Sequence, residues 1–235
     1  MVETLLRQLH AESMLMAASL VMLWIHRSWK GRFLQRLLAL LATSVHELAH
    51  GIAALLIGGD FDRMEVNRDG SGRAWWRGSQ TRFRSAFVSS AGYLGTAIAG
   101  AALIALRHGP FPHALLLQVF GLALFLSAAF YVRNGFGFAT VAALGTGVVA
   151  GGLFLPWPLL GLFYCLLGTG LWYHAWRSLL QILGISAHGG IFLGQVETDA
   201  HKVARLYGGT HRTWCQVWMV LALAALMGGV WVGRY

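Results

Sequence analysis

The chain reads Thr43-Ser44-Val45-His46-Glu47-Leu48-Ala49-His50-Gly51 in the middle of an apolar segment that runs from Phe33 to Ile57. On a helix, His46 and His50 are four residues apart, so their imidazoles project from one face and can bind a single metal ion. Glu47 lies beside them. In the pattern H-E-x-x-H, two neutral imidazoles hold zinc and the glutamate acts as a general base towards water. The stretch therefore predicts a helical metal site.

The surroundings of this motif place it at membrane depth. Glu47 is the only acidic residue between Phe33 and Ile57. Ionisable side chains are costly in hydrocarbon unless they have a partner, and a shared metal ion provides one. The alternative is a coincidental match, as occurs in soluble proteins whose histidines face water. The apolar flanks make that alternative the weaker one.

The composition is that of a membrane protein. Of the 235 residues, 57% are hydrophobic and only 11% are charged, far from the balance of soluble domains. The length suits a single integral membrane domain over residues 1–235. Thirty glycines against four prolines fit helices that pack closely. The net charge of +9 comes from arginines spread through the loops between spans, so nucleic-acid binding is not expected.

Apolar runs divide the chain into spans. Residues 1–12 are predicted to form a short interfacial helix ahead of the first span, or else the first span extends backwards through Leu9. The predicted spans are residues 13–25, 33–57, 83–106, 113–132, 138–155, 158–176 and 214–232. We therefore expect an all-α polytopic membrane bundle of about six to seven transmembrane helices.

Two loops carry structure of their own. In the loop 58–82, β-prone runs flank the turn residues 67–72, which predicts a β-hairpin, with an ordinary surface loop as the alternative. Its edge at residues 64–66 would lie beside the metal and accept an extended peptide. In the loop 178–213, residues 199–207 are predicted to form a short amphipathic helix. Lys and Arg gather on one side of the bundle, which places the N-terminus, the hairpin and this second loop in the cytoplasm.

A catalytic zinc site needs a third protein ligand. A carboxylate must come from a loop, because spans three to seven contain no acid. The predicted span 33–57, which carries His46 and His50, ends on the cytoplasmic side of the membrane, and Asp199 lies on the same side. Asp199 is equally suited to capping the helix 199–207. The candidates are Asp60, Asp62, Glu65, Asp69, Glu197, Asp199, His174, His188, His201 and His211.

The chain resembles the site-2-protease family of intramembrane zinc metalloproteases, in its small bacterial-type branch. The resemblance rests on the motif at residues 44–51, the hairpin turn 69–72, Ser89-Ser90-Ala91-Gly92-Tyr93-Leu94-Gly95, Arg133-Asn134 and Thr198-Asp199-Ala200. Larger members carry the third ligand in a Leu-Asp-Gly motif. Here the only Asp-Gly, Asp69-Gly70, lies in the hairpin turn.

The resemblance implies a set of roles. Zn²⁺ would be held by His46, His50 and Asp199, with Glu47 as the catalytic base and Asn134 as a second catalytic group that steadies the oxyanion or, alternatively, only caps a helix. Histidine and carboxylate also accept other divalent metals. The expected reaction is hydrolysis of a peptide bond in or near the transmembrane segment of a single-span membrane protein, in a bacterial-type plasma membrane. The alternative function is a non-catalytic zinc-binding membrane scaffold or chaperone of the same fold.

Overall fold

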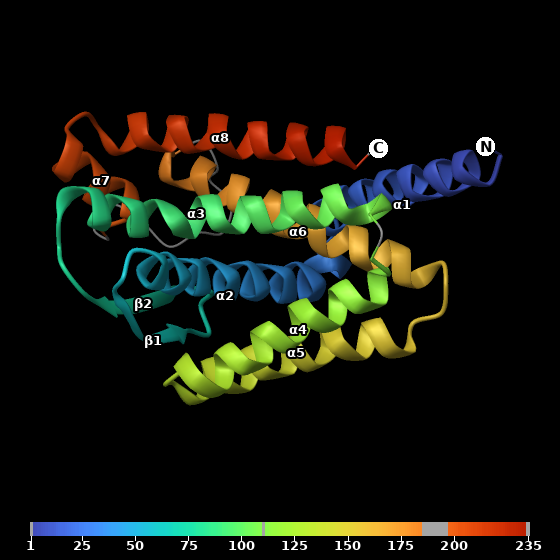
Figure 1. Cartoon of the computed structure of the whole chain (residues 1–235), viewed down its shortest axis with the longest axis horizontal. Coiled ribbons are helices and arrows are strands. Elements are labelled where there is room, and N and C mark those ends of the chain that lie inside the picture. Colours follow the sequence, from blue (N-terminus) through green and yellow to red (C-terminus); the bar gives the residue numbers. More distant parts are fainter. Residues whose placement is uncertain (1, 110, 185–196, 234–235) are drawn as a thin grey trace.

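The computed structural model describes residues 2–109, 111–184 and 197–233, which form a bundle of long helices with a β-hairpin at one end (Figure 1). Short 3-10 turns at Trp29–Gly31 and Leu106–His108 flank two of these helices. The elements are α1 (Val2–Arg27), α2 (Arg32–Leu56), β1 (Asp60–Val66), β2 (Gly72–Arg77), α3 (Arg82–Ala105), α4 (His113–Tyr131), α5 (Gly135–Phe154), α6 (Leu159–Ile182), α7 (Asp199–Tyr207) and α8 (His211–Val232).

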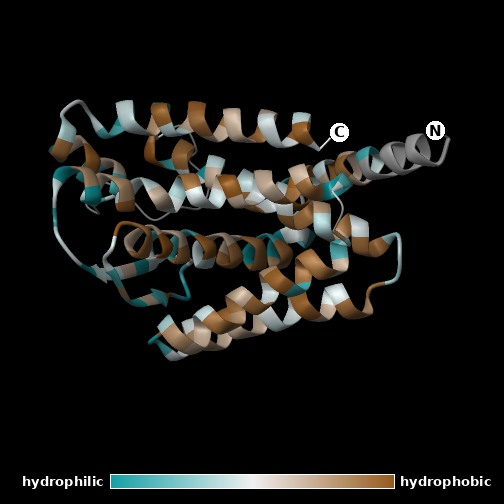
Figure 2. Cartoon of the chain, in the orientation of Figure 1, coloured by the Kyte–Doolittle hydropathy of each residue, from teal (hydrophilic) through white to brown (hydrophobic). Residues whose placement is uncertain are grey.

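The prediction of a helical membrane bundle is confirmed. In the described ranges, five helices are long and apolar enough to cross a membrane, namely α2 with the turn before it, α3 with the turn after it, α4, α5 and α8. Large apolar side chains such as Phe130 on α4 and Met227 on α8 are exposed, as suits contact with lipid. Hydrophobic residues cover the helices, and hydrophilic residues gather at the hairpin and the connections (Figure 2). The helices α1 and α6, with 26 and 24 residues, fall outside this group of five, so their spanning stays a prediction.

Of the two N-terminal predictions, the separate interfacial helix is wrong and the first helix extended backwards through Leu9 is present. The helix α1 continues without interruption from Val2 to Arg27. No glycine or proline occurs before Gly31, so nothing in the local sequence ends the helix between the polar start and the apolar run.

The helix α2 lies in the middle of the bundle, with α3 on one side and the α4–α5 pair on the other (Figure 1). Its residues Leu38 and Leu41 are buried in one apolar cluster with Leu103 of α3 and Leu171 of α6. The helices α3 and α6 approach closely at Gly100, where an added Cβ would lie 2.6 Å from the Gly168 carbonyl oxygen. Small residues at such crossings let the helix backbones touch.

The predicted hairpin is present. The strands β1 and β2 pair antiparallel, with Phe61 opposite Trp76 and Met64 opposite Ala74. Their turn is tied to α2, because Thr43 Oγ1 donates to the Gly70 carbonyl oxygen at 2.8 Å and Arg36 Nη2 donates to the Arg68 carbonyl oxygen at 2.8 Å. These two bonds hold the hairpin turn, and with it the start of β2, against α2.

The prediction that the edge at residues 64–66 accepts an extended peptide is wrong, because this edge of β1 is already paired. Met64 and Val66 of β1 are fully buried, and the segment after α4 occupies their edge. Val132 bridges Met64 in parallel, and Arg133 N donates to the Met64 carbonyl oxygen at 3.1 Å. The outer strand of this two-stranded sheet is therefore β2. A pattern of β-prone residues predicts a hairpin but does not reveal which edge another segment covers.

We expect Gly100→Val to lower the stability of the bundle by about 1–3 kcal/mol, because the new side chain would overlap the backbone of α6. Gly228→Val on α8 is the matched control, since no other element of the described structure lies within 4 Å of the position that its Cβ would take. Thermal unfolding in detergent, followed by circular dichroism, should show a lower midpoint for the first variant alone. Equal midpoints would contradict the close α3–α6 contact.

Candidate metal centre

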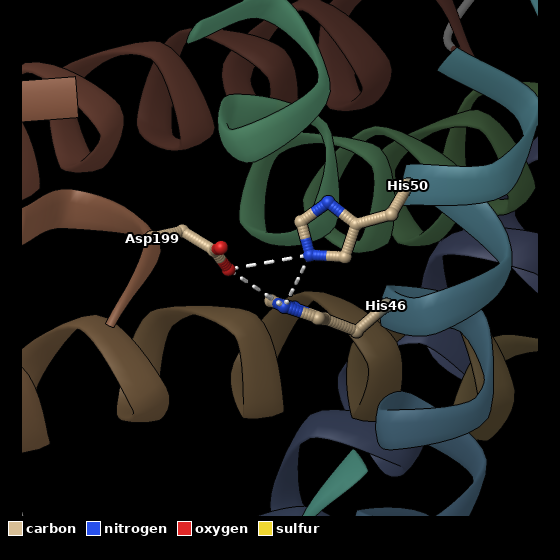
Figure 3. A group of neighbouring side chains, drawn as sticks. All are labelled: His46, His50 and Asp199. Atoms are coloured by element: carbon tan, nitrogen blue, oxygen red, sulfur yellow. Dashed lines mark hydrogen bonds and ion pairs between the residues drawn. The ribbon is translucent and has the colours of Figure 1, made fainter. Parts of the chain in front are cut away.

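Three side chains from two distant parts of the chain converge on one point (Figure 3). His46 and His50 project from one face of α2, with their Nε2 atoms 3.1 Å apart. Asp199, at the start of α7, directs Oδ2 to 3.2 Å from His50 Nε2 and 3.6 Å from His46 Nε2. The predicted trio of ligands is thus brought together by the fold.

The geometry and chemistry of this cluster fit a zinc ion. Donors about 2.0–2.1 Å from a tetrahedral zinc lie roughly 3.3 Å from one another, close to the three separations found here. Two imidazoles and one carboxylate are a usual donor set, and three protein ligands leave a fourth position for a reactant. The same donors also suit other divalent metals, so the geometry supports a metal site and leaves zinc as the expected ion.

A backbone contact orients His50. Its Nδ1 lies 2.6 Å from the Val88 carbonyl oxygen of α3. A carbonyl oxygen only accepts, so Nδ1 must carry the proton, and in the neutral imidazole the Nε2 lone pair then faces the cluster. A second partner of this kind fixes both the tautomer and the ring of a metal-binding histidine.

Asp199 is placed by the helix that it begins. The N-cap of α7 is Thr198, whose hydroxyl lies 2.8 Å from His201 Nδ1, so the capping alternative for Asp199 is wrong. Asp199 Oδ1 accepts from Lys202 Nζ at 2.9 Å. With no metal bound, burial alone would raise the pKa of the Asp199 carboxyl, but the protonated imidazole of His50 and hydrogen bonds from both imidazoles hold it well below its usual range. The carboxylate is therefore ionised and directed at the cluster.

Five of the other candidates for the third ligand have partners of their own. Ser71 donates to Asp69 through its hydroxyl and its backbone, which lowers the pKa of Asp69. Asp62 pairs with Arg77 at 3.5 Å, and Glu197 pairs with Arg205. The rings of His201 and His211 stack on each other.

Among the described residues, only His46, His50 and Asp199 form a metal-binding group. The candidates that lie outside this group are Asp60, Asp62, Glu65, Asp69, His174, Glu197, His201 and His211. His188 lies outside the described residues.

Glu47 lies beside the cluster, buried to 5% exposure. A Cβ added to Gly72 would come within 2.5 Å of Glu47 Oε1, so the backbone at the start of β2 covers the carboxylate. Glu47 also lines a cavity of about 910 Å³ together with the three cluster residues and β2. Within the described chain, its carboxylate makes no hydrogen bond or ion pair. It is therefore available to a water molecule or a substrate in the cavity.

The helix α3 closes the other side of the centre at Gly92. A Cβ at this position would lie 2.3 Å from His46 Nε2 and 2.5 Å from His50 Nε2. Only a residue without a side chain leaves room for the two imidazoles to converge.

To steady an oxyanion, the Asn134 carboxamide would have to face the cavity with a free N–H. The structure instead pairs this carboxamide with the backbone of Val66. Its Oδ1 accepts from Val66 N at 3.2 Å, and its Nδ2 donates to the Val66 carbonyl oxygen at 2.7 Å. Asn134 holds the N-cap position of α5, but its side chain does not cap that helix. It is also absent from the residues that line the cavity. Its carboxamide instead continues the backbone pairing of β1.

Sequence reasoning did not identify Thr43, Gly72, Val88 or Gly92 as parts of the centre. Gly92 lies in the stretch 89–95, which supported the family resemblance, but the sequence did not indicate what Gly92 does. The contribution of Val88 is a backbone carbonyl, which its residue type does not reveal. These roles depend on contacts between elements that are far apart in the sequence.

Comparison with known proteins identifies one related group. A family model described as Peptidase M50B-like matches residues 13–229, which is most of the chain. No curated protein and no solved structure was found that matches it.

We expect Asp199→Asn to weaken metal binding by more than about tenfold, because the cluster loses its only negative charge. The measurement is bound metal per protein after dialysis against graded zinc concentrations. Glu197→Gln is the matched control, since Glu197 also lines the cavity but pairs with Arg205. Unchanged metal content in Asp199→Asn would remove Asp199 from the ligand set.

Gly92→Ala should also reduce bound metal, here by displacing the two imidazoles while all three ligands remain in the sequence. Gly147→Ala on α5 serves as control, because no neighbouring element among the described residues comes within 4 Å of its added Cβ. If Gly92→Ala bound metal as the control does, the close approach of α3 to the imidazoles would be refuted.

Proposed function

The chain belongs to the Peptidase M50B-like group of the site-2-protease family, and we propose that it is an intramembrane zinc metalloprotease. Membership in a metallopeptidase family and five apolar helices make it an integral membrane protein of a peptidase family. The proposal adds that this chain itself cleaves a peptide bond, and that the bond lies in or near the transmembrane segment of a single-span protein.

The observation that carries the proposal is the carboxylate of Glu47, which lies beside the His46, His50 and Asp199 cluster and has no partner among the described residues. A metal ion bound there would supply Lewis-acid activation of water and of a carbonyl group. Glu47 then takes a proton from the attacking water and delivers it to the amine that leaves. Burying an acidic side chain inside a candidate span without a partner among the described residues costs free energy, and a non-catalytic scaffold would gain nothing in return.

Substrate access is proposed along β2. A transmembrane helix satisfies its own backbone hydrogen bonds, so it must unwind locally to present a peptide bond. Residues 72–76 of β2 line the cavity, and β2 is the outer strand because the segment after α4 covers β1. An unwound segment can add to β2 by main-chain hydrogen bonds next to Glu47.

The orientation in the membrane is also a proposal. The excess of Lys and Arg at the hairpin and at α7 favours the cytoplasmic side of a bacterial-type plasma membrane for these two elements. The start of α1 lies at the opposite end of the bundle in Figure 1, so the structure does not place the N-terminus on the side of the hairpin, as the sequence had predicted. The hairpin and α7 lie at the same end of the bundle in Figure 1, which agrees with one shared side for these two elements. The bilayer and a membrane-embedded substrate are the proposed partners.

The test is cleavage of a purified single-span substrate in detergent. We expect Glu47→Gln to lower kcat by about 10²–10⁴ because the base is lost, while bound zinc stays at the wild-type level. Glu65→Gln removes an acid of β1 that does not line the cavity, and it should cleave at the wild-type rate. Equal turnover in Glu47→Gln and wild type would end the protease proposal and leave the non-catalytic scaffold.

A further inference from the structure

The reaction proposed above develops negative charge on the carbonyl oxygen of the substrate. Hydrogen-bond donors directed at that oxygen stabilise the transition state. The carboxamide of Asn134 is bound to the backbone of Val66, so the donor must be sought elsewhere. Several side chains of the cavity have donors without a hydrogen-bond partner within the described chain, and those on the two helices nearest the imidazoles or facing them are Ser89, Tyr93 and His174.

Of the three, Tyr93 touches the ligand cluster. Its ring lies edge-on to His46, with the ring centroids 4.5 Å apart and the planes at 81°. On α8, Trp218 stacks on the same tyrosine at 5.4 Å, with the planes at 22°. Two neighbours thus hold the ring, and its rotation in the cavity is restricted.

The hydroxyl of Tyr93 has no partner within the described residues, although the side chain lines the cavity. Its position follows Gly92 directly, and Gly92 is the point at which α3 meets both imidazoles. The cavity that this side chain lines is the one that Glu47 and Asp199 also line. A phenol in this position can donate a hydrogen bond and stay protonated.

His174 lacks these links to the centre. Its ring lies 5.4 Å from that of His26 of α1, and the charges that act on it are those of His26 and Arg177. Ser89 is buried and lies next to Val88, whose carbonyl oxygen already orients His50. Ser89 is therefore the alternative donor. Tyr93 is the stronger candidate because its ring contacts the ligand His46 directly.

We propose that the Tyr93 hydroxyl donates a hydrogen bond to the carbonyl oxygen of the scissile peptide as that oxygen becomes negatively charged. This inference rests on the proposed protease function. No proton is transferred to the substrate in this step, and the hydroxyl binds the charged oxygen more strongly than the neutral carbonyl. Tyr93 thereby becomes a catalytic residue from α3 that lines the same cavity as Glu47 of α2.

The first test is Tyr93→Phe, which keeps the ring contacts with His46 and Trp218 and removes only the hydroxyl. We expect kcat on the single-span substrate to fall by about 10²–10³, with KM and bound zinc unchanged. The matched control is Tyr131→Phe. Tyr131 stacks on Phe61 of the hairpin at 4.1 Å and does not line the cavity, so its variant should cleave at the wild-type rate.

The second test measures binding and needs no turnover. In a phosphinic peptide, a negatively charged tetrahedral group replaces the scissile carbonyl and mimics the transition state. Its affinity for zinc-loaded Tyr93→Phe should fall by the same factor as kcat. The affinity of an uncleaved peptide, measured in the Glu47→Gln background with and without Tyr93→Phe, should not change.

Wild-type kcat and phosphinate affinity in Tyr93→Phe would overturn the inference and leave the protease proposal intact. Loss of both in Ser89→Ala but not in Tyr93→Phe would overturn it in favour of Ser89. A zinc-loaded wild-type protein that binds the phosphinate and cleaves no substrate would instead count against the proposed function. The role of Tyr93 would then still be judged by the phosphinate affinity.

Discussion

The contact between Asp199 and the two imidazoles of α2 is the constraint on which the rest of the structure depends. Polar and ionisable groups inside a membrane span must be satisfied by one another or by a bound ion. Asp199 lies within 3.6 Å of both histidines and so gives the cluster the negative charge that a divalent cation requires. Val203 of α7 packs in one buried cluster with Trp218 of α8 and Ala86 of α3. This packing fixes the position of α7 and thereby places the Asp199 carboxylate beside the two imidazoles.

Glycine decides how closely the backbone surrounds the centre. Gly92 lets α3 reach the two imidazoles, and Gly72 lets β2 reach the carboxylate of Glu47. Both approaches replace water by main chain around charged groups, which strengthens the electrostatic interactions inside the cavity. The glycines that carry no such contact, such as Gly147 and Gly228, show that the residue type alone does not mark a functional position.

The hairpin has two unequal edges. The segment 132–134 pairs with β1, and the side chain of Asn134 extends that pairing by binding both the N–H and the carbonyl of Val66. The edge of β2 therefore faces the cavity without competition from the described part of the chain. In the proposed function, Asn134 fixes the strand on which the substrate platform is built, while groups on α2 and α3 act on the reacting atoms.

The sequence by itself determined the helical membrane bundle, the hairpin, the helix 199–207 and the pairing of His46 with His50. Each of these follows from local periodicity, turn residues or spacing along one helix. Only the tertiary structure decided that Asp199 joins the histidines, that β1 rather than β2 is covered, and that Asn134 binds Val66. These choices depend on how α3, α7 and the segment after α4 pack around α2, and residues that are far apart in the chain carry no local signal of that packing.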